Sequence, residues 1–125
     1  MTNPVRSQPP VVAVLVARDP GDWFEETLAS LANQDYENLK VLVVDTGFEP
    51  VAERVNALIP DSIVLQDQEA RGFGMAANRV LKAATGSSFY LFLQDDVCLE
   101  PQTVSVLINE AVISNAGVVG PKLVM

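Results

Sequence analysis

Five short apolar runs, rich in β-branched residues, constrain the fold of this chain more than any other feature of its sequence. They cover residues 11–17, 39–44, 62–65, 89–93 and 117–124. The runs are apolar at nearly every position rather than at every second one, which is typical of strands buried on both faces of a parallel sheet. None of them is long enough to cross a bilayer.

Amphipathic helical patterns occupy the intervals between these runs. Apolar residues recur there at spacings of three and four. Pro60 and Gly86 follow two of the patterns and Pro101 opens another, as expected for helix ends. The patterns lie within residues 24–32, 51–58, 77–84 and 101–112. The alternation predicts a doubly wound α/β fold with a mainly parallel, Rossmann-like sheet and right-handed crossovers.

The length of 125 residues fits one domain with its own core. Residues 1–10 are polar and proline-rich and lack the apolar centre of a secretory signal, so we expect a flexible lead-in there and the domain over residues 11–125. A single cysteine, Cys98, excludes an intrachain disulfide and agrees with a reducing compartment. We therefore expect a cytoplasmic protein. Association of a longer parent chain with the cytoplasmic side of a membrane stays open.

The net charge of −8 and the absence of histidine narrow the functional classes. The eight basic residues are scattered rather than gathered in a stripe, so we expect no binding to nucleic acid. Without histidine the chain lacks a Ser-His-Asp triad and the usual zinc ligands. An acidic chain that binds an anionic nucleotide must recruit positive charge from a divalent cation, a helix N-terminus or one or two arginines.

The residues that directly follow the strands are the candidates for ligand binding, because ligands of such sheets bind beyond the carboxyl ends of the strands. Asp95 and Asp96 follow the run 89–93. Two adjacent carboxylates repel each other unless a cation or hydrogen-bond donors lie between them, and Mg²⁺ or Mn²⁺ suits such a pair together with phosphate oxygens. The alternative is a solvated loop whose acids cap the next helix.

Asp45 ends the run 39–44 on the same edge of the predicted sheet. A carboxylate there can accept a hydrogen bond from a base or a ribose hydroxyl. The alternative is that Asp-Thr-Gly simply forms a turn, which aspartate and glycine both favour.

A glycine-rich segment, RGFGMAAN, runs from Arg71 to Asn78. Gly72 and Gly74 belong to a G-x-G-x-x-A pattern, the loose fingerprint of a dinucleotide site, although about six polar residues separate it from the preceding strand. A second interpretation is a loop that brings Arg71 and a helix N-terminus close to a bound phosphate or sugar, with Asn78 one turn into that helix. A third is a mobile surface loop.

Several segments, taken in order, resemble the inverting glycosyltransferases of family 2, which have the GT-A fold. They read VVAVLVARDP, SLANQDYENLKVLVVDTG, ARGFGMAANRVLKAATG and LFLQDDVCLEP, and the closing GVVGPKLV is similar to a Gly-Pro-Lys strand of the family. The RGFG and GPKL versions are most similar to the rhamnosyl- and galactofuranosyl-transferase-like branch. Three positions depart from the common pattern: Thr46, Ala70 and Gln94.

The resemblance implies roles for the candidate residues. Asp45 would contact the nucleobase, Asp95 would approach the ribose or the sugar, and Asp96, the last acid of a DxD-type motif, would hold Mg²⁺ or Mn²⁺. The remaining contacts with the nucleotide-sugar would come from Ala17 and Arg18 beside the base and from Arg71, Gly72, Gly74 and Asn78 along the diphosphate and the sugar.

The resemblance also implies that the chain is the nucleotide-sugar-binding half of a truncated GT-A domain. The acceptor-binding half and the general base would lie beyond Met125, so no catalytic residue is expected within the chain. The donor would be a UDP- or dTDP-sugar, and the acceptor a glycan, a lipid-linked molecule or a polyprenyl molecule. Alone, this segment would bind donor with little or no turnover and would self-associate through uncovered apolar surface.

Without the resemblance, the residues are also compatible with two other classes of protein. A dinucleotide-binding oxidoreductase domain would place the glycine-rich segment on its cofactor. A non-catalytic nucleotide-binding or receiver-like module would use acids after its first strand and a lysine near its last, and Asp19 and Lys122 only loosely meet that requirement.

Overall fold

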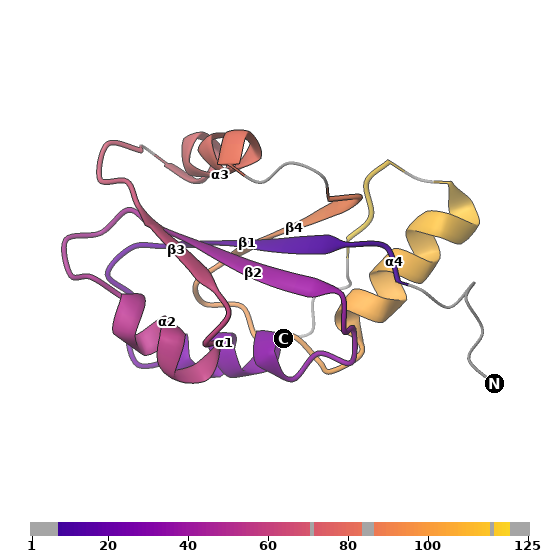
Figure 1. The fold of residues 1–125 in the computed structure, drawn as a ribbon, viewed down its shortest axis with the longest axis horizontal. Coiled ribbons are helices and arrows are strands. Elements are labelled where there is room, and N and C mark those ends of the chain that lie inside the picture. The colour runs from indigo at the N-terminus through magenta and orange to yellow at the C-terminus, as the bar shows by residue number, and fades with distance from the viewer. Residues whose placement is uncertain (1–7, 71, 84–86, 116, 121–125) are drawn as a thin grey trace.

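The computed structural model describes residues 8–70, 72–83, 87–115 and 117–120. Four strands form one parallel sheet in the order β3-β2-β1-β4, and β1 and β2 run side by side through the centre of the molecule (Figure 1). The elements in chain order are β1 (Val11–Ala17), α1 (Phe24–Ala32), β2 (Leu39–Asp45), α2 (Ala52–Leu58), β3 (Ile63–Gln66), α3 (Gly72–Ala83), β4 (Phe89–Gln94) and α4 (Thr103–Ser114). The predicted α/β fold is confirmed.

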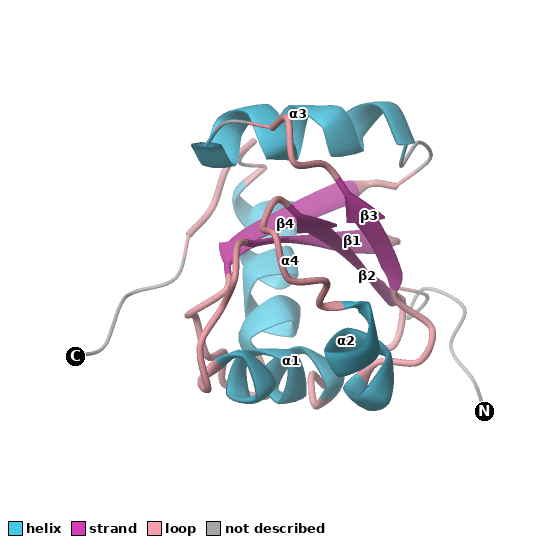
Figure 2. Cartoon of the chain, turned by 90° about the vertical axis from the view of Figure 1, so that its left-hand side faces the viewer, coloured by secondary structure: helices cyan, strands magenta, loops and turns pink. Residues whose placement is uncertain are grey.

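Both faces of the sheet are covered by helices, which explains why the strands are apolar at nearly every position. Leu15 and Val43 pack in the layer shared with α1 and α2. Val14 and Val44 pack on the opposite face, against Val80 of α3. Figure 2 shows α3 on one side of the sheet and α1 and α2 on the other. Successive strand residues point to opposite faces, so a doubly wound sheet must be apolar on both.

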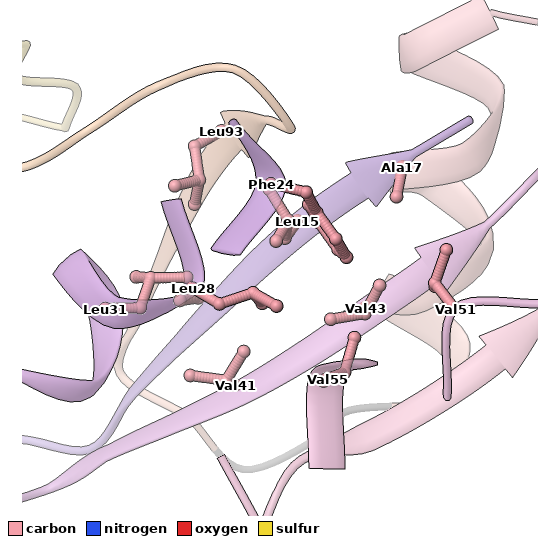
Figure 3. Close-up of a cluster of buried hydrophobic side chains, with 11 residues drawn as sticks. Leu15, Ala17, Phe24, Leu28, Leu31, Val41, Val43, Val51, Val55 and Leu93 are labelled. Carbon is pink, nitrogen blue, oxygen red and sulfur yellow. The ribbon is translucent and has the colours of Figure 1, made fainter. Parts of the chain in front are cut away.

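The larger of the two core layers lies between the sheet and helices α1 and α2 (Figure 3). Phe24, Leu28 and Leu31 are at most 2% exposed and follow the spacing i, i+4 and i+7, which places them on one face of α1. Val51 and Val55 bring the beginning of α2 to the same cluster. These contacts fix the carboxyl ends of β1 and β2 relative to each other.

The expected closing strand over residues 117–124 is not found in its described part. Residues 117–120 have no regular structure, and Val118 is 92% exposed. Residues 121–125 lie outside the described part of the chain. A strand requires a neighbour for its backbone N–H and C=O groups, and the described ladders pair only β1 with β2, β1 with β4 and β2 with β3.

Residues 8–10, which the sequence places in the lead-in, are hydrogen-bonded to the body of the domain. The Gln8 side chain accepts hydrogen bonds from the backbone N–H groups of Glu37 and Asn38. Pro9 accepts a hydrogen bond from the Tyr36 hydroxyl at 2.6 Å. Residues 1–7 lie outside the described part of the chain.

The order of the strands creates a switch point at β1. The chain leaves β1 toward β2 and β3, and then returns through α3, on the other face, to β4 on the far side of β1. In open α/β sheets, ligands bind in the crevice that this reversal leaves beyond the carboxyl ends of the strands. Within the described residues, no helix is both long and apolar enough for a membrane span.

Candidate functional site

Asp95 follows β4 at the switch point and is bound to the end of β1. Its Oδ2 accepts a hydrogen bond of 3.0 Å from the backbone N–H of Arg18. Its backbone carbonyl accepts a hydrogen bond of 3.1 Å from the Thr27 hydroxyl of α1. The half-exposed carboxylate is therefore held at the boundary between β4 and β1, where the topology predicts ligand binding.

Asp96 is exposed beside Asp95 and has no hydrogen-bond or ion-pair partner among the described residues. In the described part of the chain, no three acidic, cysteine or histidine residues gather as a metal-binding group. Mg²⁺ and Mn²⁺ fit this arrangement, since such ions accept one or two protein carboxylates and complete their shells with water and phosphate oxygens. A cation here would depend on the ligand as well as on Asp96.

Asp45 lies at the end of β2 with 0% of its surface exposed. Its Oδ1 accepts a hydrogen bond of 3.0 Å from the backbone N–H of Gly47, and its Oδ2 accepts one of 3.1 Å from Val51. The carboxylate therefore shapes the loop that leads into α2. Direct contact with a nucleobase would require this turn to open, so the predicted role of Asp45 stays a prediction.

Asp19 lies on the rim, by which we mean the edge of the sheet at the carboxyl ends of the strands. The sequence predicted no role for it in nucleotide-sugar binding. Its Oδ1 accepts hydrogen bonds of 2.9 Å from the backbone N–H groups of both Phe48 and Glu49. Asp19 has a φ of 42°, in the left-handed region that residues with a Cβ rarely adopt. The Asp-Pro dipeptide signals a turn, but the partners of its side chain lie 29 and 30 residues away along the chain.

Hydrogen bonds thus run across the rim from β4 to β3. Asp95 joins β4 to the loop after β1, and Asp19 joins that loop to the one after β2. The amide of Gln68, after β3, then donates to the Gly47 carbonyl at 3.1 Å. Ala17 is buried at the end of β1, and its carbonyl accepts from the Thr46 backbone N–H at 2.9 Å. The predicted rim residues of β1, β2 and β4 are therefore brought together.

The glycine-rich segment forms the beginning of α3 rather than a loop before it. The helix begins at Gly72, which has a φ of 77°, and a Cβ built on Gly72 or Gly74 would meet nothing within 4 Å. A ligand can therefore approach this backbone closely. Asn78 is exposed on the same helix. Arg71 lies outside the described residues.

An ion pair fixes α3 to the end of β3. The Arg79 guanidinium contacts the Asp67 carboxylate at 2.7 Å. The backbone N–H of Asp67 in turn donates to the Asp45 carbonyl at 2.8 Å. The middle of α3 is thereby joined to the segment that follows β3 and, through Asp67, to the end of β2.

An open depression lies at the opposite edge of the sheet. It has a volume of about 750 Å³ and is lined by residues at the C-terminal ends of α1 and α2 and at the beginning of β2, among them Tyr36, Lys40 and Asp61. It contains none of the rim residues described above. We place the candidate site at the switch point, because ligand binding in this architecture follows the carboxyl ends of the strands.

The family model of glycosyl transferase family 2 matches residues 12–124, which is nearly the whole chain. No curated protein matches it. Among solved structures, Staphylococcus aureus TarS 1-349 in complex with UDP is similar, with a TM-score of 0.74 and 23% identity over 85% of this chain and 33% of that chain.

Two further solved structures share the fold. Mannosyltransferase PcManGT from Pyrobaculum calidifontis, in complex with GDP-Man and Mn²⁺, has a TM-score of 0.63 and 26% identity over 74% of this chain and 29% of that chain. Glucosyl-3-phosphoglycerate synthase from Mycobacterium tuberculosis, in complex with Mn²⁺, UDP and glucosyl-3-phosphoglycerate, has a TM-score of 0.64 and 21% identity over 82% and 39%. The chain spans less than half the length of each of these three structures.

Proposed function

Because the chain belongs to glycosyl transferase family 2, we propose that its parent protein transfers a sugar from a nucleoside diphosphate-sugar to a hydroxyl acceptor with inversion. This chain would supply the donor-binding half of the GT-A domain. The acceptor side and the general base would be supplied by residues beyond Met125. On its own, the chain would then bind donor with little or no turnover.

The position of Asp95 and Asp96 at the switch point is the observation that carries this proposal. Asp95 is bound to the backbone of Arg18, whereas Asp96 is exposed and free to face a ligand. Asp96 would hold Mg²⁺ or Mn²⁺, and Asp95 would approach the ribose or the sugar. A cation bound there would neutralise the diphosphate as it leaves.

The proposed reaction is an in-line displacement at the anomeric carbon. The acceptor oxygen forms a bond to that carbon while the bond from the carbon to the diphosphate oxygen breaks, and the hydroxyl proton passes to a carboxylate base. The rim described above binds and orients the donor. The exposed start of α3, with Gly72 and Gly74, would lie along the diphosphate, where backbone N–H groups and the helix dipole favour negative charge.

The donor and the cation are proposed by similarity to proteins of the same fold. TarS was solved with UDP, PcManGT with GDP-Man and Mn²⁺, and the mycobacterial synthase with Mn²⁺ and UDP. For this chain we propose a UDP- or dTDP-sugar. The RGFG and GPKL segments support a rhamnosyl- or galactofuranosyl-transferase-like donor. The acceptor would be a glycan, a lipid-linked molecule or a polyprenyl molecule, used on the cytoplasmic side.

The structure also supports the proposed self-association of this segment. Apolar side chains are exposed to solvent on α4 and in the residues after it. Val106 is 61% exposed, Ile113 is 71% exposed and Val118 is 92% exposed. Phe92 on β4 is 42% exposed, and β4 is an edge strand among the described strands. Exposed apolar side chains and a strand edge that is unpaired among the described strands both favour association with another chain.

The alternative of a dinucleotide-binding oxidoreductase is not favoured. Its glycine fingerprint belongs in the first βα turn, where it contacts the cofactor at the switch point. Here Gly72 and Gly74 follow β3, an edge strand, and the first βα turn contains Arg18 and Asp19. A receiver-like module is not favoured either, because the family match extends over residues 12–124.

The test is the thermal unfolding of this chain with UDP-sugars and dTDP-sugars, each with and without Mn²⁺. We expect stabilisation that requires both nucleotide-sugar and metal and that is lost in Asp96→Ala. Asp61→Ala is the matched control, since Asp61 is an exposed aspartate at the opposite edge of the sheet. Stabilisation by NAD that is indifferent to metal would contradict the proposal.

A further inference from the structure

Phe48 lies in the loop after β2 and is 76% exposed, although its side chain is large and aromatic. A single exposed hydrophobic residue is ordinary on a protein surface. Phe48 differs because its loop belongs to the rim at which the strands end and because that loop is held on both sides. Its position and its fixed backbone, rather than its exposure alone, indicate a function.

Three side chains hold the loop around Phe48. The carboxylate of Asp19 accepts from the backbone N–H groups of Phe48 and Glu49, and the buried carboxylate of Asp45 accepts from that of Gly47. On the other side, the amide of Gln68 donates to the Gly47 carbonyl. The Asp45 carboxylate also accepts from Val51 at the start of α2. The loop that contains Phe48 is thus bound to the segments that follow β1 and β3, and is also braced from within by Asp45.

This attachment imposes two conformational constraints. A Cβ built on Gly47 would lie 2.6 Å from both the backbone nitrogen and Oδ1 of Asp19, so only glycine fits there. Asp19 itself is in the left-handed region, with a φ of 42°. Unfavourable backbone conformations persist where the surroundings determine them, and they cluster at ligand-binding sites. The loop is therefore built to hold one conformation at the rim.

The geometry of the sheet relates this loop to the acidic pair. β4, β1 and β2 are neighbours, so the end of β2 lies two strand spacings, about 10 Å, from the end of β4. Among the described strands β4 is an edge, so the rim extends from Asp95 and Asp96 only toward β1 and β2. A nucleotide with its diphosphate at Asp96 and its ribose near Asp95 would extend its base over the loop that contains Phe48.

On the basis of the proposed function, we propose that Phe48 is a donor-binding residue that stacks against the nucleobase of the donor, while Asp19 and Asp45 position its loop. Phenylalanine offers an apolar face to a base and no hydrogen-bonding group. The contact would therefore add affinity for the nucleoside part of the donor without selecting among bases. Base selection would come from hydrogen bonds made elsewhere on the rim.

The experiment compares Phe48→Ala with the wild-type chain by isothermal titration with UDP and with pyrophosphate, both in the presence of Mn²⁺. We expect Phe48→Ala to bind UDP about tenfold more weakly, as for the loss of one base–aromatic stacking contact, and to bind pyrophosphate as the wild type does. Phe48→Tyr should retain UDP affinity. Ile63→Ala is the matched control, since Ile63 is a 54% exposed apolar residue at the beginning of β3.

Three results would contradict part or all of this inference. Equal UDP affinity of Phe48→Ala and the wild type would overturn the role of Phe48 and leave the proposed function standing. Equal loss of affinity for UDP and pyrophosphate would place Phe48 on the diphosphate and would also overturn base stacking. If the wild type binds none of UDP, dTDP and GDP with Mn²⁺, both the inference and the proposed function fail.

Discussion

The carboxylate of Asp95 and the backbone N–H of Arg18 meet at 3.0 Å and join the end of β4 to the end of β1. This contact distinguishes two acids that are neighbours in the sequence. Asp95 is engaged with the protein backbone, whereas Asp96 is exposed. The first is therefore suited to hold the rim in shape and the second to bind a cation.

We expect Asp95→Ala to weaken the binding of a UDP-sugar with Mn²⁺ by about tenfold, because the Arg18 N–H loses its charged acceptor and the rim loses a carboxylate. Asp95→Asn retains an oxygen that can accept from Arg18, so it should lie between Asp95→Ala and the wild type. Isothermal titration measures both variants. Identical affinities of the two would show that the charge, and not the contact with Arg18, is what matters.

Replacing Asp45 should reduce the stability of the fold. Asp45→Ala leaves two buried N–H donors, of Gly47 and Val51, without their acceptor. We expect a loss of about 3 kcal/mol in the free energy of unfolding, measured by urea denaturation. Asp45→Asn should lose less, since its amide oxygen still accepts from one donor. A stability equal to that of the wild type would indicate that the loop opens readily and that Asp45 is available to a ligand.

Most of the strands and helices could be predicted because they bury repeating sets of apolar residues, although β3 is mostly exposed. Phe24, Leu28 and Leu31 carry the helical period of α1 in the sequence itself, and the same residues form the core. The expected strand over residues 117–124 shows why apolar residues alone are not enough to predict a strand. An apolar run becomes a strand only when another strand accepts its backbone hydrogen bonds, and the sequence does not show the partner.

The rim could be predicted in position but not in detail. The carboxyl ends of the strands follow from topology, so Asp45, Asp95 and Asp96 could be placed on one edge of the sheet. Whether a carboxylate there faces a ligand or the backbone depends on contacts between distant loops. Asp19 binds N–H groups 29 and 30 residues away, and no local pattern reveals such a contact. The same holds for the burial of Asp45.

At two glycines on this edge of the molecule, replacement by alanine should have opposite effects on the stability of the fold. Gly47→Ala places a Cβ 2.6 Å from the backbone nitrogen of Asp19, which cannot move without breaking the contact between the two loops. We expect this variant to lose about 2 kcal/mol in the free energy of unfolding. Urea denaturation measures the change.

Gly74→Ala is the matched variant, because its Cβ would enter open space on α3. Alanine is the better helix former by about 1 kcal/mol, so this variant should be at least as stable as the wild type. If it is stable but binds a nucleotide-sugar with Mn²⁺ more weakly, the diphosphate lies against the first turn of α3. Destabilisation by Gly74→Ala comparable to that by Gly47→Ala would show that the helix start is more closely packed than the structure indicates.

The ion pair between Glu25 and Arg54 ties α1 to α2 and should make stability depend on pH. Arg54 donates to the two carboxylate oxygens of Glu25 at 2.6 and 2.7 Å. This hydrogen bonding holds the pKa of Glu25 below its ordinary value of 4.5. A carboxylate with a lowered pKa stabilises the fold at pH values above its ordinary pKa, and this contribution is lost as the pH falls through the lowered value.

Glu25→Gln should therefore unfold more easily than the wild type at pH 7, and the difference should be smaller at pH 3, because Glu25 gains protons as the pH falls toward its lowered pKa. Both side chains are partly exposed, at 46% for Glu25 and 34% for Arg54, so solvent screening limits the expected difference at pH 7 to about 0.5 kcal/mol. Urea denaturation at the two pH values measures it. Glu26→Gln is the control, because Glu26 is the exposed next residue and forms no ion pair with the described residues. A difference between Glu25→Gln and the wild type that grows toward pH 3 would contradict the assignment, since a protonated Glu25 has no charge left for Arg54 to stabilise.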